Sequence, residues 1–403
     1  MKDLTKGKPS SLILSFAFPI FLANLLQLTY SLADTRIVGS FLGEDALAAV
    51  GSTSTVSNLI IGFLLGLANG FAIITAQRFG AKDIKGMKKS FAASILLGTG
   101  ISIVLTVLGM AFKNTLLGFL NVPHNLYGEA GAYIFIIIAG MTATFLYDSC
   151  AAVLRSLGDT ITPLIILLVS VALNITGDLF FVVVLKSGVR GAAIATVLAQ
   201  IIAFVICFVY MFKKYEILRL TKSDFTALDG NLVRNMLGSG LSMGFMSSLV
   251  NIGSLTLQTA INKLGQDIIV AHTAARKISE MFMIMFTVFG QTMATYCGQN
   301  MGAGRIDRVK AGIKSALIYT CSWCVLTVIA SYTIGDWLIY LVTGSNNENV
   351  IRNAVNYLKF DTVFYFVTAF ICILRNAMQG LGEHIIPLVS SSLEMVGKII
   401  IAA

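Results

Sequence analysis

Charged side chains are scarce in this chain of 403 residues. Asp, Glu, Lys and Arg together make up 12% of the sequence, whereas hydrophobic residues make up 56%. A water-soluble domain carries about 25% charged residues, and the mean hydropathy here is +0.83. Too little polar surface is available to cover a soluble globular protein, so that class is excluded.

Residues that hold metals or perform catalysis are also sparse. The three histidines are scattered along the chain, which indicates no metal cluster. The six cysteines fall in or beside apolar stretches, and the only C-x-x-C, at Cys321 and Cys324, has no second ligand pair. No zinc-protease motif H-E-x-x-H occurs. We therefore expect neither an enzyme nor a cofactor.

What the chain does have is a series of long apolar windows. A bilayer core about 30 Å thick is crossed by about 20 apolar residues in a helix. The windows lie at 13–38, 47–76, 90–112, 131–154, 162–185, 190–212, 236–260, 268–297, 312–334, 353–374 and 386–403. They predict an all-α polytopic protein surrounded by the lipid bilayer.

The net charge of +9 would suggest a nucleic-acid partner if the protein were soluble. Its distribution argues against that. With a cytoplasmic N-terminus, 19 of the 29 Lys and Arg residues lie on the inner side of the membrane and six on the outer side. Short inner loops of membrane proteins carry such an excess. We expect a multi-pass protein of the plasma (inner) membrane with its N-terminus inside, and no nucleic acid.

The sequence repeats itself. "LGEDALAAVGSTSTVSN" from Leu42 matches "LGQDIIVAHTAARKISE" from Leu264, a shift of 222. The same shift relates "AQRFGA" at 76–81 to "GQNMGA" at 298–303, and "LGDTITPL" at 157–164 recurs at 381–388, shifted by 224. A period that holds six helices gives both halves the same orientation, related by an axis along the membrane normal.

This repeat divides the chain. We predict an N-lobe at 1–212 with helices 1–6, a basic cytoplasmic linker at 213–235, and a C-lobe at 236–403 with helices 7–11. Two six-helix repeats would need a twelfth helix after the eleventh. We expect that helix to be missing from this chain.

Four strings together resemble one family. They are "LADTRIVGSFLGEDALAAVG" from Leu32, "AQRFGAKDIKGMKKS" from Ala76, "LRSLGDTITP" from Leu154 and "GQNMGAGRIDRVKAG" from Gly298. They are similar to the MATE (multidrug and toxic compound extrusion) antiporters of the MOP flippase superfamily. The resemblance covers both halves and implies a V-shaped fold of two lobes. It also implies export of organic, often cationic, drugs in exchange for H⁺ or Na⁺.

An acidic residue stands out in "NITGDLFFVVVL", which begins at Asn174. Asp178 shares a helix face with Asn174, and a carboxylate in hydrocarbon costs about 2.5–3.5 kcal/mol even on lenient scales. Asp34 and Thr196 lie at comparable depth in their own windows. The resemblance to the DinF-like branch implies that Asp34, Asn174, Asp178 and Thr196 form the coupling-cation site, for H⁺ or Na⁺.

Four further residues are candidates of second rank for the cation or the substrate. Gln27 and Tyr30 share the face of Asp34, while Glu280 and Asp361 lie in the second half. Glu280 is also one turn from Arg276, which makes a local ion pair the alternative. At the repeat offsets, Asp34 and Asp178 correspond to Thr256 and Ala402, so the acid pair belongs to the first half alone.

Two transport functions remain open. The first is a monomeric antiporter of small organic molecules, as the resemblance implies. The second is a flippase for lipids or lipid-linked oligosaccharides, which shares the superfamily fold. A flippase is expected to have a strongly basic central cavity, whereas most basic residues here fall in the inner loops.

Overall fold

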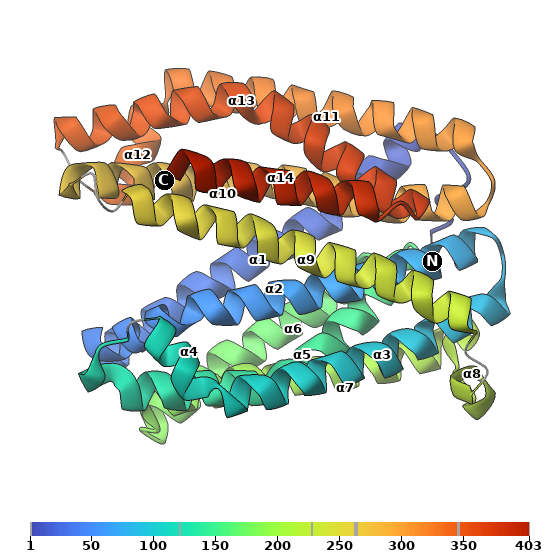
Figure 1. The fold of residues 1–403 in the computed structure, drawn as a ribbon, viewed down its shortest axis with the longest axis horizontal. Coiled ribbons are helices and arrows are strands. Elements are labelled where there is room, and N and C mark those ends of the chain that lie inside the picture. Colours follow the sequence, from blue (N-terminus) through green and yellow to red (C-terminus); the bar gives the residue numbers. More distant parts are fainter. Residues whose placement is uncertain (1, 121, 227–228, 262–264, 345–346, 403) are drawn as a thin grey trace. The chain divides into compact units, whose positions relative to one another are not determined.

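The computed structural model describes residues 2–120, 122–226, 229–261, 265–344 and 347–402 (Figure 1). The chain forms two compact units. Unit 1 comprises residues 1–3 and 22–248, and unit 2 comprises residues 4–21 and 249–403. Two helices, α1 (Pro9–Leu42) and α9 (Gly230–Ile261), contribute to both units.

The other helices each belong to one unit. Those of unit 1 are α2 (Glu44–Gly80), α3 (Ile84–Ala111), α4 (Lys113–Phe119), η1 (His124–Leu126), α5 (Tyr127–Ser156), α6 (Ile161–Asp178), η2 (Leu179–Val184), α7 (Gly188–Lys214), η3 (Glu216–Leu218) and α8 (Lys222–Thr226). Those of unit 2 are α10 (Gln266–Gly302), α11 (Ile306–Thr333), α12 (Gly335–Thr343), α13 (Glu348–Leu381) and α14 (Ile385–Ala402). Within unit 1, α2, α3 and α5 pack on one another, and within unit 2, α10 packs on α11 and α13 (Figure 1).

The predicted membrane helices are present. Each apolar window lies within an observed helical segment or extends at most one residue beyond it, apart from Ala403, which lies outside the described residues. Among the described residues, ten segments are long and apolar enough to cross a membrane. The eleventh, α10, carries Arg276, Lys277 and Glu280 and does not reach that hydropathy. The prediction of an all-α polytopic membrane fold is confirmed.

The internal repeat is visible in the elements themselves. Helices α2 and α10 both have 37 residues, and α3 and α11 both have 28. A glycine with φ of 88° or 96° precedes α2 and α10, at Gly43 and Gly265. Equal helix lengths at the offset of 222 mean that one structural plan is used twice.

The repeated string "LG[DE]-x-x-x-PL" forms the same turn in both halves. Gly158 and Gly382 take φ of 84° and 91°, values that favour glycine. The acid that follows each glycine then accepts from the start of the next helix. Asp159 Oδ1 accepts from the Thr162 amide at 3.0 Å, and Glu383 Oε1 accepts from the Ile385 amide at 2.9 Å. These residues set the entry into α6 and α14.

The two compact units do not coincide with the sequence halves. Residues 230–248 of α9 pack on α2 in unit 1, while residues 9–21 of α1 pack on α10 in unit 2. Since α1 and α9 correspond in the repeat, each unit takes the first part of this helix from the other half. A division within the linker 213–235, as predicted from the repeat, does not anticipate this exchange.

Glycines permit the close contact between α2 and α9. A Cβ at Gly66 or Gly70 would lie 2.5 Å from the carbonyl oxygen of Met243 or Ser239. Such spacing of small residues by four is how helices approach closely in membranes. The facing string on α9, Gly240 to Gly244, also fits the hydrolase pattern G-x-S-x-G, but it lies in mid-helix rather than in a strand-to-helix turn. Its role is packing.

The second long motif fixes the N-terminal segment to unit 2. Gln299 Oε1 accepts from the Leu4 amide at 2.9 Å, and Asn300 Nδ2 donates to the Leu4 carbonyl at 3.2 Å. Arg308 Nη1 donates to the Gly7 carbonyl at 2.9 Å. The string "GQNMGAGRIDR" therefore serves to hold the start of the chain against the turn between α10 and α11.

Candidate functional site

Three helices of unit 1 bring the predicted cation-site residues together. Asp34 comes from α1, Asn174 and Asp178 from α6, and Thr196 from α7. Asp178 is 0% exposed and Asn174 2%, while Asp34 is half-buried. The carboxyl groups of Asp34 and Asp178 are direct neighbours. The i, i+4 spacing on α6 places Asn174 and Asp178 on the same buried face.

Thr196 orients the amide of Asn174. The Thr196 hydroxyl donates to the Ala192 carbonyl at 3.1 Å, so its oxygen is left to accept the Asn174 Nδ2 proton at 3.2 Å. With the amide nitrogen engaged, Asn174 presents its Oδ1 as a free acceptor. Thr196 thus positions a ligand atom rather than acting alone.

The site has acceptors without donors. Asp34 Oδ1, Asn174 Oδ1 and both carboxylate oxygens of Asp178 are buried and have no hydrogen-bond partner among the described residues. Buried polar atoms are almost always satisfied, and leaving a charged one unsatisfied costs several kcal/mol. Four such oxygens in one place, supplied by only three residues, form an environment that favours a bound cation or a shared proton.

Apolar side chains close one end of the site. Val38 lies one turn beyond Asp34, Val182 one turn beyond Asp178, and Ala192 one turn before Thr196, and all three belong to one buried cluster. Water is thereby kept from the carboxyl groups on this side. The lower local dielectric strengthens every interaction of the pair with a cation.

The backbone of α6 changes character at the site. The sequence predicted a single helix over 162–185, but the α-helix ends at Asp178 and continues as a π-helix over Leu179–Val184. The Leu185 amide bonds to the Phe180 carbonyl at 2.9 Å, five residues earlier. Short π segments are rare and occur frequently at functional sites. Hydrophobic periodicity does not distinguish them from α-helix.

The second-rank residues of the first half separate into two groups. The Tyr30 hydroxyl lies 3.4 Å from the Thr196 hydroxyl oxygen, at the edge of the site. Gln27, in contrast, is exposed, so sharing a helix face with Asp34 did not bring it into the cluster.

Sequence reasoning missed two residues around the site. Tyr133 of α5 lies within electrostatic reach of Asp34, Asp178 and Tyr30. Gln200 lies one turn after Thr196 on α7, and its Oε1 is buried without a hydrogen-bond partner among the described residues. The i, i+4 rule from Thr196 could have identified Gln200. The sequence does not indicate that α5 packs beside Asp34 and Asp178.

A second polar group lies further along α5. Asp148 and Arg155 are close enough to interact electrostatically, and Arg155 Nη2 donates to Asn69 Oδ1 on α2 at 3.3 Å. Asp148 was not identified from the sequence, although it is an acid within an apolar window. Unlike Asp178, it has a basic residue two turns away, so its charge is compensated within the helix.

The acids of the second half have partners. Glu280 is 50% exposed and pairs with Arg276 at 3.7 Å and Lys277 at 3.5 Å, which confirms the predicted local ion pair. The carboxylate of Asp361 accepts from the hydroxyls of Ser279 at 2.7 Å and Tyr365 at 3.0 Å. Since neither acid is left unsatisfied, the need for a cation is greatest in unit 1.

Comparison with known proteins agrees with this description. The MatE family model matches this chain twice, at residues 19–180 and 242–403, an offset of 223 (242 minus 19). The probable multidrug resistance protein YpnP of Bacillus subtilis is 28% identical over 384 residues, covering 94% of this chain and 84% of YpnP. The probable multidrug resistance protein NorM of Thermotoga maritima is 23% identical over 382 residues, covering 94% and 81%.

Solved structures share the fold. A crystal structure of MATE in complex with MaL6 superposes with a TM-score of 0.91 at 22% identity, covering 99% of this chain and 90% of that one. A MOP superfamily transporter from Pyrococcus furiosus gives 0.90 at 23% identity, covering 98% and 87%. The fold and the site define a multi-pass membrane protein built from one helical repeat used twice. With both repeats matched, the chain belongs to the MatE family.

Proposed function

We propose that this protein is a secondary antiporter that exports small organic, often cationic, compounds in exchange for H⁺ or Na⁺. The observation that carries the proposal is the set of four buried, unpartnered oxygens of Asp34, Asn174 and Asp178. Relatives named as multidrug resistance proteins, such as YpnP, and as a multidrug export protein, MepA of Staphylococcus aureus, support the direction and the kind of substrate.

The chemistry of the site suits both coupling ions. Two neighbouring carboxylates in a low dielectric cannot both ionise cheaply, so the pair retains a proton in common. Na⁺, a hard cation, prefers the same carboxylate and amide oxygens. Either ion reduces the negative charge between α1 and α6 and removes the desolvation cost of the acids. Loss of the ion restores that cost and favours repacking of the helices.

The repacking can take place in the π-helical segment η2. It begins at the residue after Asp178 and carries Val182, which belongs to the apolar cluster over the site. A shift between π and α hydrogen bonding would rotate the side chains that follow Asp178. We propose that occupancy of the site is relayed to α6 through this segment.

We also propose assignment to the DinF-like branch, which is supported by the match of Asp34, Asn174, Asp178 and Thr196 to the N-lobe pattern that the resemblance implies. The inner excess of Lys and Arg supports a plasma (inner) membrane protein with a cytoplasmic N-terminus. We also propose that the protein works as a monomer, because the site is built from residues of one unit. Thiol labelling of Lys82→Cys from the cytoplasmic side alone tests the orientation.

Flux in proteoliposomes tests the function. The purified protein is reconstituted with ethidium as the organic cation, and a pH gradient or a Na⁺ gradient is imposed separately. We expect at least one gradient to drive ethidium against its concentration, and ethidium to drive the counter-movement of that ion. If neither gradient moves ethidium or any other amphipathic cation, the antiporter proposal fails and the lipid or oligosaccharide flippase takes its place.

A further inference from the structure

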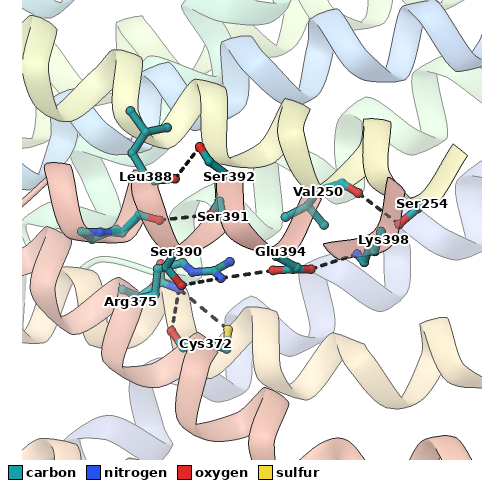
Figure 2. A network of polar contacts seen from close by, with 12 residues as sticks. Val250, Ser254, Cys372, Arg375, Leu388, Ser390, Ser391, Ser392, Glu394 and Lys398 are labelled. Atoms are coloured by element: carbon teal, nitrogen blue, oxygen red, sulfur yellow. Dashed lines mark hydrogen bonds and ion pairs between the residues drawn. The ribbon is translucent and has the colours of Figure 1, made fainter. Parts of the chain in front are cut away.

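Three ionisable side chains of unit 2 meet where α14 packs on α13 (Figure 2). Arg375 Nη2 donates to Glu394 Oε2 at 3.1 Å and to Ser390 Oγ at 3.0 Å. Lys398 Nζ donates to the other oxygen of Glu394 at 2.9 Å. Two cations thus share one carboxylate, which leaves this cluster with one positive charge in excess.

The cluster is shielded from solvent to different degrees. The Arg375 side chain is 9% exposed, and its Nε is buried with no hydrogen-bond partner among the described residues. The side chains of Glu394 and Lys398 are 33% and 28% exposed, so an approaching group can reach them. An uncompensated cation within a membrane protein is costly, and an anion bound beside it offsets that cost.

Helix α14 turns this cluster toward the protein. Ser390, Glu394 and Lys398 follow one another at a spacing of four residues and form a polar stripe, whereas Leu393 and Ile400 on the other side are 67% and 69% exposed. Apolar side chains on the exposed face suit lipid contact. The polar stripe therefore lies against α13 and α9 and away from these exposed apolar side chains.

Helix α9 restrains Lys398. A Cβ at Gly253 would lie 2.9 Å from Lys398 Cδ, so the aliphatic stem of the lysine lies against the helix backbone. The ammonium group is thereby held near Glu394 and Arg375 and does not extend freely into solvent. A pre-positioned cation loses less conformational entropy when it binds a ligand.

In the internal repeat, this cluster corresponds to positions of α6 that include a residue of the proposed cation site. At the offset of 224 that relates α6 to α14, Lys398 corresponds to Asn174 and Glu394 corresponds to Ser170. Helix α6 of the first half thus carries hydrogen-bond acceptors without donors, and the corresponding helix α14 of the second half carries cationic donors in excess of its acidic acceptors. The same helix position selects ions of opposite charge in the two halves.

We propose that Arg375, Ser390 and Lys398 form a binding site in unit 2 for the anionic oxygen group, carboxylate or phosphate, of an organic molecule. Glu394 is the internal competitor, which keeps the affinity moderate and the binding reversible. Guanidinium and ammonium groups make charge-assisted hydrogen bonds to such oxygens. Binding at this site does not depend on the proposed function. Only the export of the bound molecule does.

Equilibrium binding of two matched probes tests the site. The full chain is placed in phosphatidylcholine nanodiscs without any gradient and titrated with dansylglycine, an organic carboxylate, and with its neutral amide. We expect dansylglycine to bind about tenfold more tightly, the factor that 1.4 kcal/mol provides. Lys398→Gln should reduce that preference to about twofold or less, because Arg375 and Glu394 then balance and the cluster carries no excess positive charge.

Glu394→Gln distinguishes a binding site from a structural ion cluster. Removing the internal competitor frees both cations, so dansylglycine should bind about tenfold more tightly than it does to wild type. A cluster that only fastens α14 would lose thermal stability in both variants and show no change in probe preference. Lys359→Gln is the matched control, since its ammonium lies 5.5 Å from the Tyr332 ring centroid and away from Glu394.

Two results would overturn the site: equal binding of the two probes to wild type, or an unchanged preference in Lys398→Gln. Phosphatidylglycerol in the nanodiscs identifies the source of the anion. If it weakens dansylglycine binding to wild type but not the residual binding to Lys398→Gln, a lipid headgroup uses the site; if it has no effect, a soluble organic anion does. Asp178→Asn should bind dansylglycine as wild type does, so failure of ion coupling would leave this test intact.

Discussion

Asp178 is fully buried, close to a second carboxyl group, and lacks a hydrogen-bond donor among the described residues. A carboxylate kept only for packing tolerates replacement by an amide of nearly the same shape. A carboxylate kept for ion coupling does not, because the amide neither titrates nor carries charge. The two roles therefore predict different behaviour for one conservative substitution.

We expect Asp178→Asn to fold and to reach the membrane at the wild-type level, and to lose gradient-driven ethidium efflux. Asp34→Asn should behave in the same way, since one carboxylate alone no longer forms the coupled pair. Asp361→Asn is the control: its carboxylate already accepts from Ser279 and Tyr365, and efflux should be reduced less. Wild-type efflux by both first-half variants would move the coupling site elsewhere.

Thr196 is expected to act through Asn174. Thr196→Val keeps the shape of the side chain but removes the oxygen that engages Asn174 Nδ2. Loss of a residue that orients an ion ligand costs about 10–100-fold in affinity, so the ion concentration for half-maximal efflux should rise by about tenfold or more. Thr176→Val, whose exposed hydroxyl bonds only within α6, should leave that concentration unchanged. Equal behaviour of the two variants would contradict the positioning role.

At the scale of elements, helix contacts depend on small residues. A side chain at Gly70 would collide with the Ser239 carbonyl, whereas nothing lies within 4 Å of a Cβ at Gly51 in the same helix. Overpacking costs about 1–3 kcal/mol, so Gly70→Leu should lower the thermal midpoint of unit 1 in detergent by several degrees. Gly51→Leu should leave it within error of wild type. The same midpoint for both variants would show that α2 and α9 separate freely.

The turn between α5 and α6 makes stability depend on pH. Burial opposes ionisation of Asp159, but hydrogen bonds from the Tyr215 hydroxyl and from Thr162, with the nearby Lys214 ammonium, hold the pKa of this carboxyl below its usual value. Burial and the bond to Asp159 raise the pKa of Tyr215 to about 12, so this hydroxyl remains a donor. A lowered carboxyl pKa stabilises the folded state above pH about 4, and that contribution is lost as the pH falls through the folded pKa.

Asp159→Asn should therefore lower the thermal midpoint at neutral pH, by the loss of charge-assisted hydrogen bonds worth about 1.5–3 kcal/mol each. The difference from wild type should begin to shrink as the pH falls below about 4, where the carboxyl of the unfolded chain takes up a proton, and should be lost below the lowered pKa of the folded state. Thermal melts over this pH range measure it. A difference that stays constant across that range would show that the charge of Asp159 contributes nothing.

Much of the element plan could be predicted from the sequence, because a helix that crosses a membrane must be long and apolar. The acid pair could be predicted because a carboxylate in hydrocarbon is energetically costly and therefore indicates a functional site. The contributions of Tyr133 and Arg375 could not, since apolar windows do not say which helix packs on which. The exchange of α1 and α9 between units was missed for the same reason: the repeat shows correspondence in sequence, and contacts depend on glycines at 66 and 70 meeting those at 240 and 244.

For the whole molecule, the unequal halves determine how transport responds to ions. The fold repeats, but among the described residues buried carboxylate oxygens without a hydrogen-bond partner occur in unit 1 alone, and the second-half acids Glu280, Asp361 and Glu394 are paired or hydrogen-bonded. Under the proposed function, one coupling site would then serve the molecule, although the family model matches both halves. H⁺ and Na⁺ would have to use the same oxygens of Asp34, Asn174 and Asp178, and they cannot occupy them together.

The two ions should therefore compete and not add. In proteoliposomes with a pH gradient that drives ethidium efflux, adding Na⁺ equally on both sides should slow the efflux, because Na⁺ occupies the site without supplying a driving force. Lower pH should in turn raise the Na⁺ concentration needed for half inhibition, since protons hold the carboxyl pair. K⁺ at the same concentration controls for ionic strength. Two gradients applied together should drive efflux no faster than the stronger one alone. Additive rates would require a second ion site, and the acids of unit 2 would then be the place to look for it.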